Sequence, residues 1–411
     1  MIPRLRPSIS GADIAAAFLG RTSVQEFEAA FAGLMDQQHA VAFAYGRSGL
    51  MLLLEVLCLK DAEIICPAYT CVVVAHAIVH SGNRPVFVDS RSGDFNMDLE
   101  LAEAAIGPRT RALIATSIHG YPVDLDRLDG IRARNPGLII IQDCAHSFAA
   151  KWKGRPVQRE GQAAIFGLNI SKSMTSIFGG MVTTDDADLA GRLRSARDQR
   201  LQPANWLRSL SRAVYLAAAT TALFPPAFTV VDKIRRLGLI DRFTEYYDEN
   251  VVDMPRDYLM AMSAAEASVG QRQVKRYHAL VEHRCRIATV YDEALATCRN
   301  IQRPPLVSGA TYSHYVACVD QPEALMADVA RQGVELGRLI DYCVPDMPAY
   351  RNGTEKTADF PVTRALNGSV INLPLHVTEQ QARDIASLVT SSLDARRDPS
   401  GHAASSRSLR A

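Results

Sequence analysis

Short apolar runs alternate with helical patterns along the first part of the chain. Seven of these runs have the length of a β-strand, and several end in glycine or a polar residue: 41–43, 63–66, 85–88, 112–115, 138–141, 163–166 and 180–183. Apolar strands that alternate with helical segments are typical of a parallel sheet wrapped in helices. The pattern therefore predicts an α/β fold with a mostly parallel, seven-stranded sheet.

The pattern changes near the middle of the chain. A long helical stretch at 260–294 is followed by alternating segments at 311–319 and 370–375. We therefore expect a large α/β domain over residues 1–250 and a smaller α+β domain over residues 251–393.

Two segments do not fit either domain. Residues 213–231 carry no charge, but Pro225 and Pro226 divide them. We interpret this part of an insertion at about 205–243 as a buried or interfacial hairpin, and contact with a membrane surface is the less favoured alternative. Residues 394–411 are rich in Ser, Arg and Ala without apolar periodicity, and we expect a disordered tail there.

Charge and cysteine content exclude several classes of protein. Lys and Arg number 45 against 44 Asp and Glu, which gives a net charge of +1 and no electrostatic reason to bind nucleic acid. The eight cysteines show neither a CxxC pair nor zinc-ligand spacing, so we expect reduced thiols and no metal site. The basic N-terminus lacks the apolar run and cleavage site of a signal peptide, and we expect a cytoplasmic location.

Polar residues and glycines follow several of the expected strands. In an open parallel sheet, ligands bind beyond the carboxyl ends of the strands. Gly46, Pro67, Asp89, Asp143 and the segment after Phe166 should therefore face one crevice. This convergence predicts the position of a binding site.

Two residues of this region have side chains suited to catalysis. Asp143 directly follows an apolar strand, where capping of the next turn is the simpler role. Lys172 lies in a mostly apolar, glycine-rich segment, where a lysine is costly unless it is solvated, paired or used covalently. A surface lysine on a turn is the alternative.

With these residues in place, the sequence resembles the DegT-type sugar aminotransferases, which are fold type I enzymes that depend on pyridoxal 5'-phosphate (PLP). The resemblance extends from Phe27 to about Leu388 and rests on motifs in the same order. These motifs are residues 67–70 (PAYT), 85–89 (PVFVD), 108–112 (PRTRA), 120–124 (GYPVD), 143–146 (DCAH), 171–172 (SK) and 373–376 (LPLH). It implies a homodimer whose site lies between the two domains and at the subunit interface.

The resemblance also implies roles for individual residues. Lys172 matches the Schiff-base lysine, and Asp143 matches the carboxylate that pairs with the pyridine nitrogen. A carboxylate there favours the protonated ring that PLP needs as an electron sink. Lys172, once released, can act as the base that moves a proton. His146 matches a position near the ring and its phenolic oxygen, although a histidine that stabilises a turn is the alternative.

Further candidates would contact the sugar. Asn169 matches a position that often faces it, and a turn-stabilising role is nearly as well supported. Tyr69 and His314 complete the predicted substrate contacts.

Departures from the family pattern cluster around the cofactor. Cys71 stands where an aromatic side chain often covers the ring, and Gly167 stands where a serine often binds the phosphate. Leu259 and Ala261 occupy the motif from which a partner subunit often lends an asparagine, and Phe178 replaces an acidic residue.

The phosphate loop of the family is also altered, because this chain reads Gly46-Arg47-Ser48-Gly49-Leu50. Backbone N–H groups at a helix start can hold a phosphate, and a guanidinium can replace the missing neutral donors. We therefore predict that Gly46, Arg47 and Ser48 bind the phosphate, with an exposed turn arginine as the alternative for Arg47.

The implied reaction has two halves. An amino donor, expected to be glutamate, aminates the cofactor, which then aminates a keto group on a sugar, expected to be nucleotide-linked. The alternatives are another PLP reaction on a sugar, such as dehydration, and a non-catalytic homologue that acts as a scaffold or sensor at a membrane surface. In the dehydrating branch of the family a histidine replaces the lysine, so Lys172 argues against dehydration.

Overall fold

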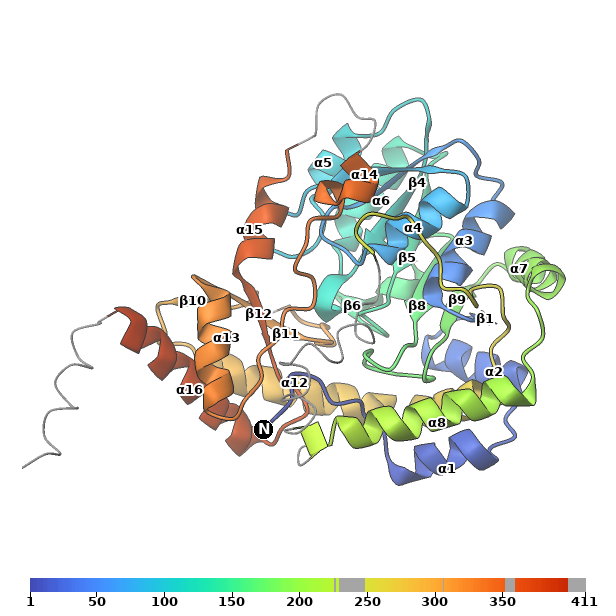
Figure 1. Cartoon of the computed structure of the whole chain (residues 1–411). Coiled ribbons are helices and arrows are strands. Elements are labelled where there is room, and N and C mark those ends of the chain that lie inside the picture. The colour runs from blue at the N-terminus through green and yellow to red at the C-terminus, as the bar shows by residue number, and fades with distance from the viewer. Residues whose placement is uncertain (225–226, 229–247, 306, 352–358, 398–411) are drawn as a thin grey trace, which may run out of the picture.

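A central sheet covered by helices and a small second sheet organise the chain (Figure 1). The computed structural model describes residues 1–224, 227–228, 248–305, 307–351 and 359–397.

The central sheet contains all seven predicted strands. Its members are β1 (His39–Phe43), β2 (Glu63–Pro67), β3 (Arg84–Val88), β4 (Thr110–Thr116), β5 (Ile139–Asp143), β8 (Ala163–Gly167) and β9 (Gly180–Thr184). Their order in the sheet is β1-β9-β8-β5-β4-β2-β3. Strand β9 is antiparallel to both of its neighbours, and the remaining pairs are parallel. The prediction of a mostly parallel, seven-stranded sheet is confirmed.

Helices bury both faces of this sheet, so its strands are apolar on both sides. Within β1, Val41 and Phe43 belong to one core and Ala40 and Ala42 to the other. The first core is covered by α3 (Gly46–Val56), α4 (Val73–His80) and α7 (Ala187–Arg200), and the second by α2 (Val24–Leu34), α5 (Leu99–Ala104) and α6 (Leu125–Arg134). The remaining elements of this part are the N-terminal helix α1 (Gly11–Leu19) and the short elements η1 (Ile118–Gly120), β6 (Lys151–Trp152), β7 (Arg155–Pro156) and η2 (Val157–Arg159).

The C-terminal part is built around a three-stranded antiparallel sheet in the order β10-β11-β12. Its elements are α12 (Tyr277–Ala294), β10 (Ile301–Gln302), β11 (Tyr315–Val319), α13 (Pro322–Arg331), η3 (Val344–Asp346), α14 (Pro348–Arg351), α15 (Pro361–Ser369), β12 (Val370–Leu373) and α16 (Glu379–Arg397). Its core contains the neighbouring rings of Tyr291 and Tyr315, which are tilted by 40° with centroids 5.0 Å apart.

The long helix expected at 260–294 is in fact two helices. α11 (Ala264–Val274) begins at a capping box formed by Ser263 and Glu266, and it ends before Arg276, which precedes α12. α11 packs on α1 and α2 and shares the core of the large sheet. The division at residue 250 stays a prediction, but this packing places α11 beside the large sheet.

The described part of the insertion is helix α8 (Trp206–Ala222), which packs on α1 and α11. Its inner face buries Ala213 and Leu216, while Trp206, Leu210 and Val214 are exposed. Among the residues that the structure describes, no helix is long and apolar enough to cross a membrane. The rest of the expected hairpin lies outside the described residues.

The predicted disordered tail over residues 394–411 overlaps the last helix. Helix α16 includes the first residues of the predicted tail and continues to Arg397. Residues 398–411 lie outside the described part of the chain.

Candidate active site

Five strands of the large sheet end around one pocket. The residues that follow β1, β2, β4, β5 and β8 line it together with the loop between β8 and β9. Its walls include Tyr45, Gly46, Arg47, Thr70, Cys71, Thr116, Ile118, Asp143, Ala145, His146, Phe166, Gly167, Asn169, Lys172 and Gly179. We call this the inner pocket. It lies where parallel-sheet proteins bind ligands.

The carboxylate of Asp143 is fixed at the end of β5. Its Oδ1 accepts the Ala145 N–H at 3.0 Å, and its Oδ2 accepts the Thr116 hydroxyl at 3.3 Å. Burial raises the pKa of Asp143 above its ordinary value, although the hydrogen bonds and nearby Lys172 act in the opposite direction. A buried carboxylate of this kind is stabilised as an anion by a cationic ligand group.

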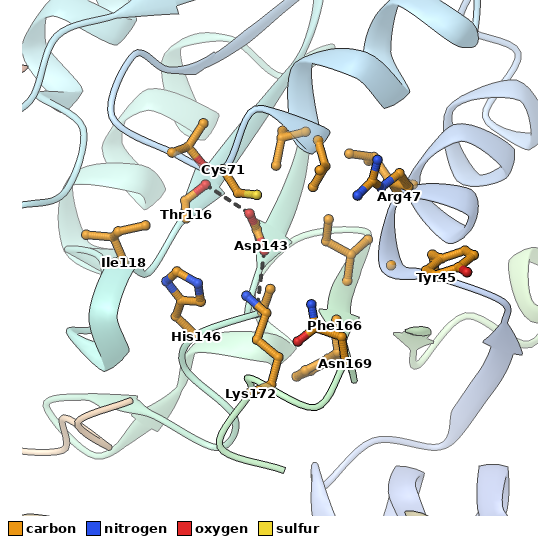
Figure 2. A pocket seen from close by; sticks show the side chains of 18 of the residues that line it. Tyr45, Arg47, Cys71, Thr116, Ile118, Asp143, His146, Phe166, Asn169 and Lys172 are labelled. Atoms are coloured by element: carbon orange, nitrogen blue, oxygen red, sulfur yellow. Dashed lines mark hydrogen bonds between the residues drawn. The ribbon is translucent and has the colours of Figure 1, made fainter. Parts of the chain in front are cut away.

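Lys172 lies in the loop of residues 168–179 that connects β8 to β9. The loop is closed by backbone hydrogen bonds from Lys172 N–H to Asn169 O at 3.0 Å and from Leu168 N–H to Gly179 O at 2.9 Å. Figure 2 shows the lysine side chain rising from this loop toward Asp143. Burial lowers the pKa of Lys172, partly offset by Cys71 and Asp143, so a larger share of this amine than of an exposed lysine is unprotonated and able to act as a nucleophile or base.

Gly167 lies beside the Lys172 side chain. A Cβ at residue 167 would lie 3.5 Å from the Lys172 Cε, which is an ordinary van der Waals contact. The lysine stem therefore passes over the position where the family often has its phosphate-binding serine.

The start of α3 forms the other end of the inner pocket. Tyr45 is its N-cap residue but forms no side-chain capping bond, and Gly46 and Arg47 line the pocket. A Cβ at Gly180 would lie 2.2 Å from the Gly46 nitrogen, so glycine is required for this close approach of the two chain segments. Arg47 is only 5% exposed, which differs from the exposed turn arginine considered above.

Ser48 points away from the pocket. It is fully buried, and its hydroxyl donates to the Tyr258 carbonyl at 2.8 Å. Its position on the helix turns it toward the 258 segment, so it helps to anchor α3 rather than line the cavity.

Tyr45 connects the pocket to the insertion. Its hydroxyl donates to Asp257 at 2.7 Å, and Arg208 and Arg212 of α8 also reach Asp257 at 2.7 Å. Burial and Asp257 raise the pKa of Tyr45 to about 12, so the phenol stays protonated. The insertion thus supports the wall of the pocket from behind.

Three histidine rings meet beside Lys172. His119 stacks on His146 with centroids 5.9 Å apart and an interplanar angle of 15°, and His314 lies 5.9 Å from each. Burial lowers the pKa of all three, that of His119 to about 3, so the rings are neutral near pH 7. Because His146 Nδ1 accepts the His119 backbone N–H at 3.4 Å, its proton lies on Nε2.

The three residues predicted to contact the sugar do not all lie at the same cavity. Asn169 and His314 both line an outer cleft that adjoins the inner pocket. The Asn169 carboxamide oxygen also accepts bonds from the Ser171 N–H and hydroxyl, so the turn-stabilising role is present as well. Tyr69 is fully buried, and its hydroxyl lies 3.3 Å from His119 Nε2, away from both cavities.

Several pocket residues were not identified from the sequence. Thr116 is the last residue of β4 just as Asp143 is the last residue of β5, and strand ends were the signal that could have found it. His119, which stacks on the pocket residue His146, directly precedes the GYPVD motif and has a positive φ of 55°, a conformation that no sequence pattern indicates for histidine. Within the described ranges, no cluster of three or more His, Cys, Asp or Glu residues could hold a metal.

Comparison with known proteins agrees with this geometry. The model of the DegT/DnrJ/EryC1/StrS aminotransferase family matches residues 16–390. The spore coat polysaccharide biosynthesis protein SpsC of Bacillus subtilis is 27% identical over 363 residues, which cover 86% of this chain and 84% of that protein. GDP-perosamine synthase of Caulobacter vibrioides is 34% identical over 181 residues, which cover 44% of this chain and 48% of the synthase.

The fold is also that of a solved relative. The PLP form of Spr1654 from Streptococcus pneumoniae superposes with a TM-score of 0.76 at 21% identity, over 96% of this chain and 98% of the other. The sheet order, the pocket at the strand ends and the family match over most of the sequence agree, and the chain belongs to the DegT/DnrJ/EryC1/StrS aminotransferase family.

Proposed function

We propose that this chain is a PLP-dependent aminotransferase that transfers an amino group to a keto group on a sugar. The observation that carries this proposal is the inner pocket, where the Lys172 amine faces the buried Asp143 carboxylate and Arg47 lies at the opposite end (Figure 2). An amine, a carboxylate and a cationic helix start are the groups needed for the aldehyde, ring nitrogen and phosphate of PLP.

The residues present fit this cofactor. The buried carboxylate of Asp143 requires a cationic partner, which a protonated ring nitrogen supplies. The N–H groups at the start of α3 lack a side-chain cap, and Arg47 adds a guanidinium for the phosphate dianion. Cys71 and His146 line the walls between these ends. When bound, PLP supplies an electron sink that stabilises negative charge on the substrate carbon.

The chain's own residues hold and move the proton. Lys172 would bind the cofactor covalently, and its Nζ, once released by the incoming amine, would act as the base at the substrate carbon. The lowered pKa of Lys172 suits this role, because more of the amine is unprotonated near pH 7. His146, with its proton on Nε2, can donate a hydrogen bond but cannot accept one at that atom.

The proposed substrates are glutamate as amino donor and a nucleotide-linked keto sugar as acceptor. A relative named for a GDP-linked product supports the nucleotide-linked class.

We further propose a homodimer, with the cleft completed at the subunit interface, and a cytoplasmic location. The eight cysteines all have free thiols, as expected in a reducing compartment.

The first test is the colour of the protein. We expect purified protein loaded with PLP to absorb in the visible range and to lose this band when glutamate is added, because the cofactor is then aminated. Stopped-flow absorbance would follow the change, and adding 2-oxoglutarate should restore the band. A protein that binds no PLP would instead favour the scaffold alternative.

Arg47→Ala is expected to weaken PLP binding by about tenfold to a hundredfold, or ~1–3 kcal/mol, because a charge-assisted contact to the phosphate is lost. Equilibrium titration of the apo protein with PLP would measure the affinity. Arg47→Lys keeps the positive charge but not the forked donors of the guanidinium, so its PLP affinity should lie between those of the wild type and Arg47→Ala. Arg21→Ala, at an exposed arginine, is the control and should bind PLP as wild type does. An unchanged affinity in Arg47→Ala would remove Arg47 from the phosphate site.

A further inference from the structure

A large cleft adjoins the inner pocket and opens to solvent. Its volume is ≈ 790 Å³, and it shares Cys71, His146, Asn169 and Lys172 with the inner pocket. Volumes of this size are typical of sites for whole cofactors or drug-sized ligands, and they exceed what an amino acid fills. We call it the outer cleft.

The first residues of the chain form one wall of the outer cleft. Ile2 pairs with Val334 in a parallel bridge, and its N–H donates to the Gly333 carbonyl at 2.8 Å. The Glu335 N–H donates to the Ile2 carbonyl at 2.8 Å, and the Arg4 N–H donates to the Glu335 carboxylate at 2.9 Å. These bonds tie residues 2–4 to the segment of residues 333–335, so the backbone position of Arg4 is defined.

The stem of Arg4 packs against Gly337. A Cβ at residue 337 would lie 2.6 Å from the Arg4 Cδ and 3.0 Å from the Asn372 carboxamide oxygen. The absent side chain at Gly337 thus makes room for Arg4 beside Asn372, and both residues line the outer cleft.

The guanidinium of Arg4 is available for a ligand. Arg4 is exposed and forms no ion pair with any residue of the described ranges, whereas the neighbouring cation Arg338 is bound to Glu323 and to the Asn367 carbonyl. The exposed carboxylates Asp248, Glu249 and Asp341 also line the cleft and disfavour an anion next to them. Of the two arginines that line the cleft, Arg4 is therefore the one without an ion pair among the described residues, and it can bind an anionic group.

We propose that Arg4 binds the anionic phosphate group of the acceptor substrate in the outer cleft. The inference rests on the proposed function and adds the residue that selects for a phosphate-bearing sugar. A guanidinium offers several donors in a fixed fork that matches phosphate oxygens. The carboxylates of the amino donor are also anions that a guanidinium binds. The volume of the cleft, however, suits a nucleotide-linked sugar better than the smaller amino donor.

The test is calorimetric titration of PLP-loaded protein with UDP, GDP and dTDP as probes. We expect at least one diphosphate to bind the wild type, and Arg4→Gln to weaken that binding by about tenfold to a hundredfold. Gly337→Ala should weaken it in the same direction by displacing the Arg4 stem. Arg6→Gln is the matched control, because the Arg6 guanidinium lies 5.7 Å from the Phe224 ring centroid rather than in the cleft.

The glutamate half-reaction separates the possible sources of the anion. Arg4→Gln should leave the rate and concentration dependence of bleaching by glutamate unchanged. The proposal is overturned if Arg4→Gln binds the diphosphates as well as wild type, if no diphosphate binds the wild type, or if only the glutamate step weakens. A wild-type protein that glutamate does not bleach would refute the proposed function, and this readout is independent of the diphosphate affinities.

Discussion

Lys172→Ala is expected to abolish transamination, with kcat reduced by at least about 10⁴-fold. Loss of a general base alone removes roughly 10²- to 10⁴-fold, and here the covalent anchor of the cofactor is lost as well. The fold should persist, because the lysine lies on a loop closed by backbone bonds that the substitution does not remove. Steady-state kinetics and thermal unfolding would measure the two effects separately.

A second readout identifies the lysine directly. After borohydride reduction of PLP-treated protein, mass spectrometry should find one cofactor on the peptide that contains Lys172, and none there in Lys172→Ala. Lys60→Ala, an exposed lysine between α3 and β2, should behave as wild type in both measurements. Full transamination by Lys172→Ala would show that the central assignment is wrong.

Asp143→Asn is expected to lower kcat by about 10²- to 10³-fold or more, the scale seen when one preorganised electrostatic group is removed. Asparagine keeps an acceptor for the Ala145 N–H, so the substitution removes the charge and retains the cap. PLP should still bind, but with its ring nitrogen less protonated, because the neighbouring anion is gone. Single-turnover kinetics and the absorbance of bound PLP would report both changes.

A control variant for Asp143→Asn removes a hydrogen bond to the Asp143 carboxylate but keeps the negative charge. Thr116→Val removes the hydroxyl that lies 3.3 Å from Asp143 Oδ2 and leaves the charge, so we expect a loss of less than about tenfold. Asp143→Ala should be at least as slow as Asp143→Asn. Wild-type kinetics in Asp143→Asn would leave only the capping role for this residue.

The insertion gives this chain a support for its site that depends on distant residues. Arg208 and Arg212 of α8 converge on Asp257, which also holds the Tyr45 hydroxyl at the edge of the inner pocket. The side chain of Arg212 also lies 4.2 Å from the Phe178 ring centroid, so Phe178, where the family has an acid, has a cationic neighbour. The departure at Phe178 and the presence of α8 are thus structurally linked.

Local pattern was enough to predict the architecture of the large sheet. Except for the partly exposed edge strand β3, the strands are buried on both faces, so their apolar runs are visible in the sequence without knowledge of their neighbours. Strand-end position and the cost of an unpaired lysine in an apolar segment made Asp143 and Lys172 candidates, but their roles as a pair came from the resemblance to the DegT-type aminotransferases.

Side-chain direction was not predictable from position in a motif. Ser48 follows Gly46 and Arg47 in the same turn, yet it faces Tyr258, because the helix rotates each successive side chain by about 100°. Tyr69 lies in the PAYT motif but turns into the small-domain core against His119. The packing partners that decide both directions are distant in sequence.

The sequence by itself therefore determined the seven strands, their helical cover and the edge of the sheet at which chemistry would occur. Only the tertiary structure decided which side chains reach that edge and what lies beyond it. The outer cleft joins Arg4 with residues near 250 and 340, and the bond from the Arg4 N–H to Glu335 spans 331 residues. The spacing of apolar residues along one segment shows only which face of that segment is buried. A contact between residues far apart in the sequence depends on how all the segments of the fold pack together.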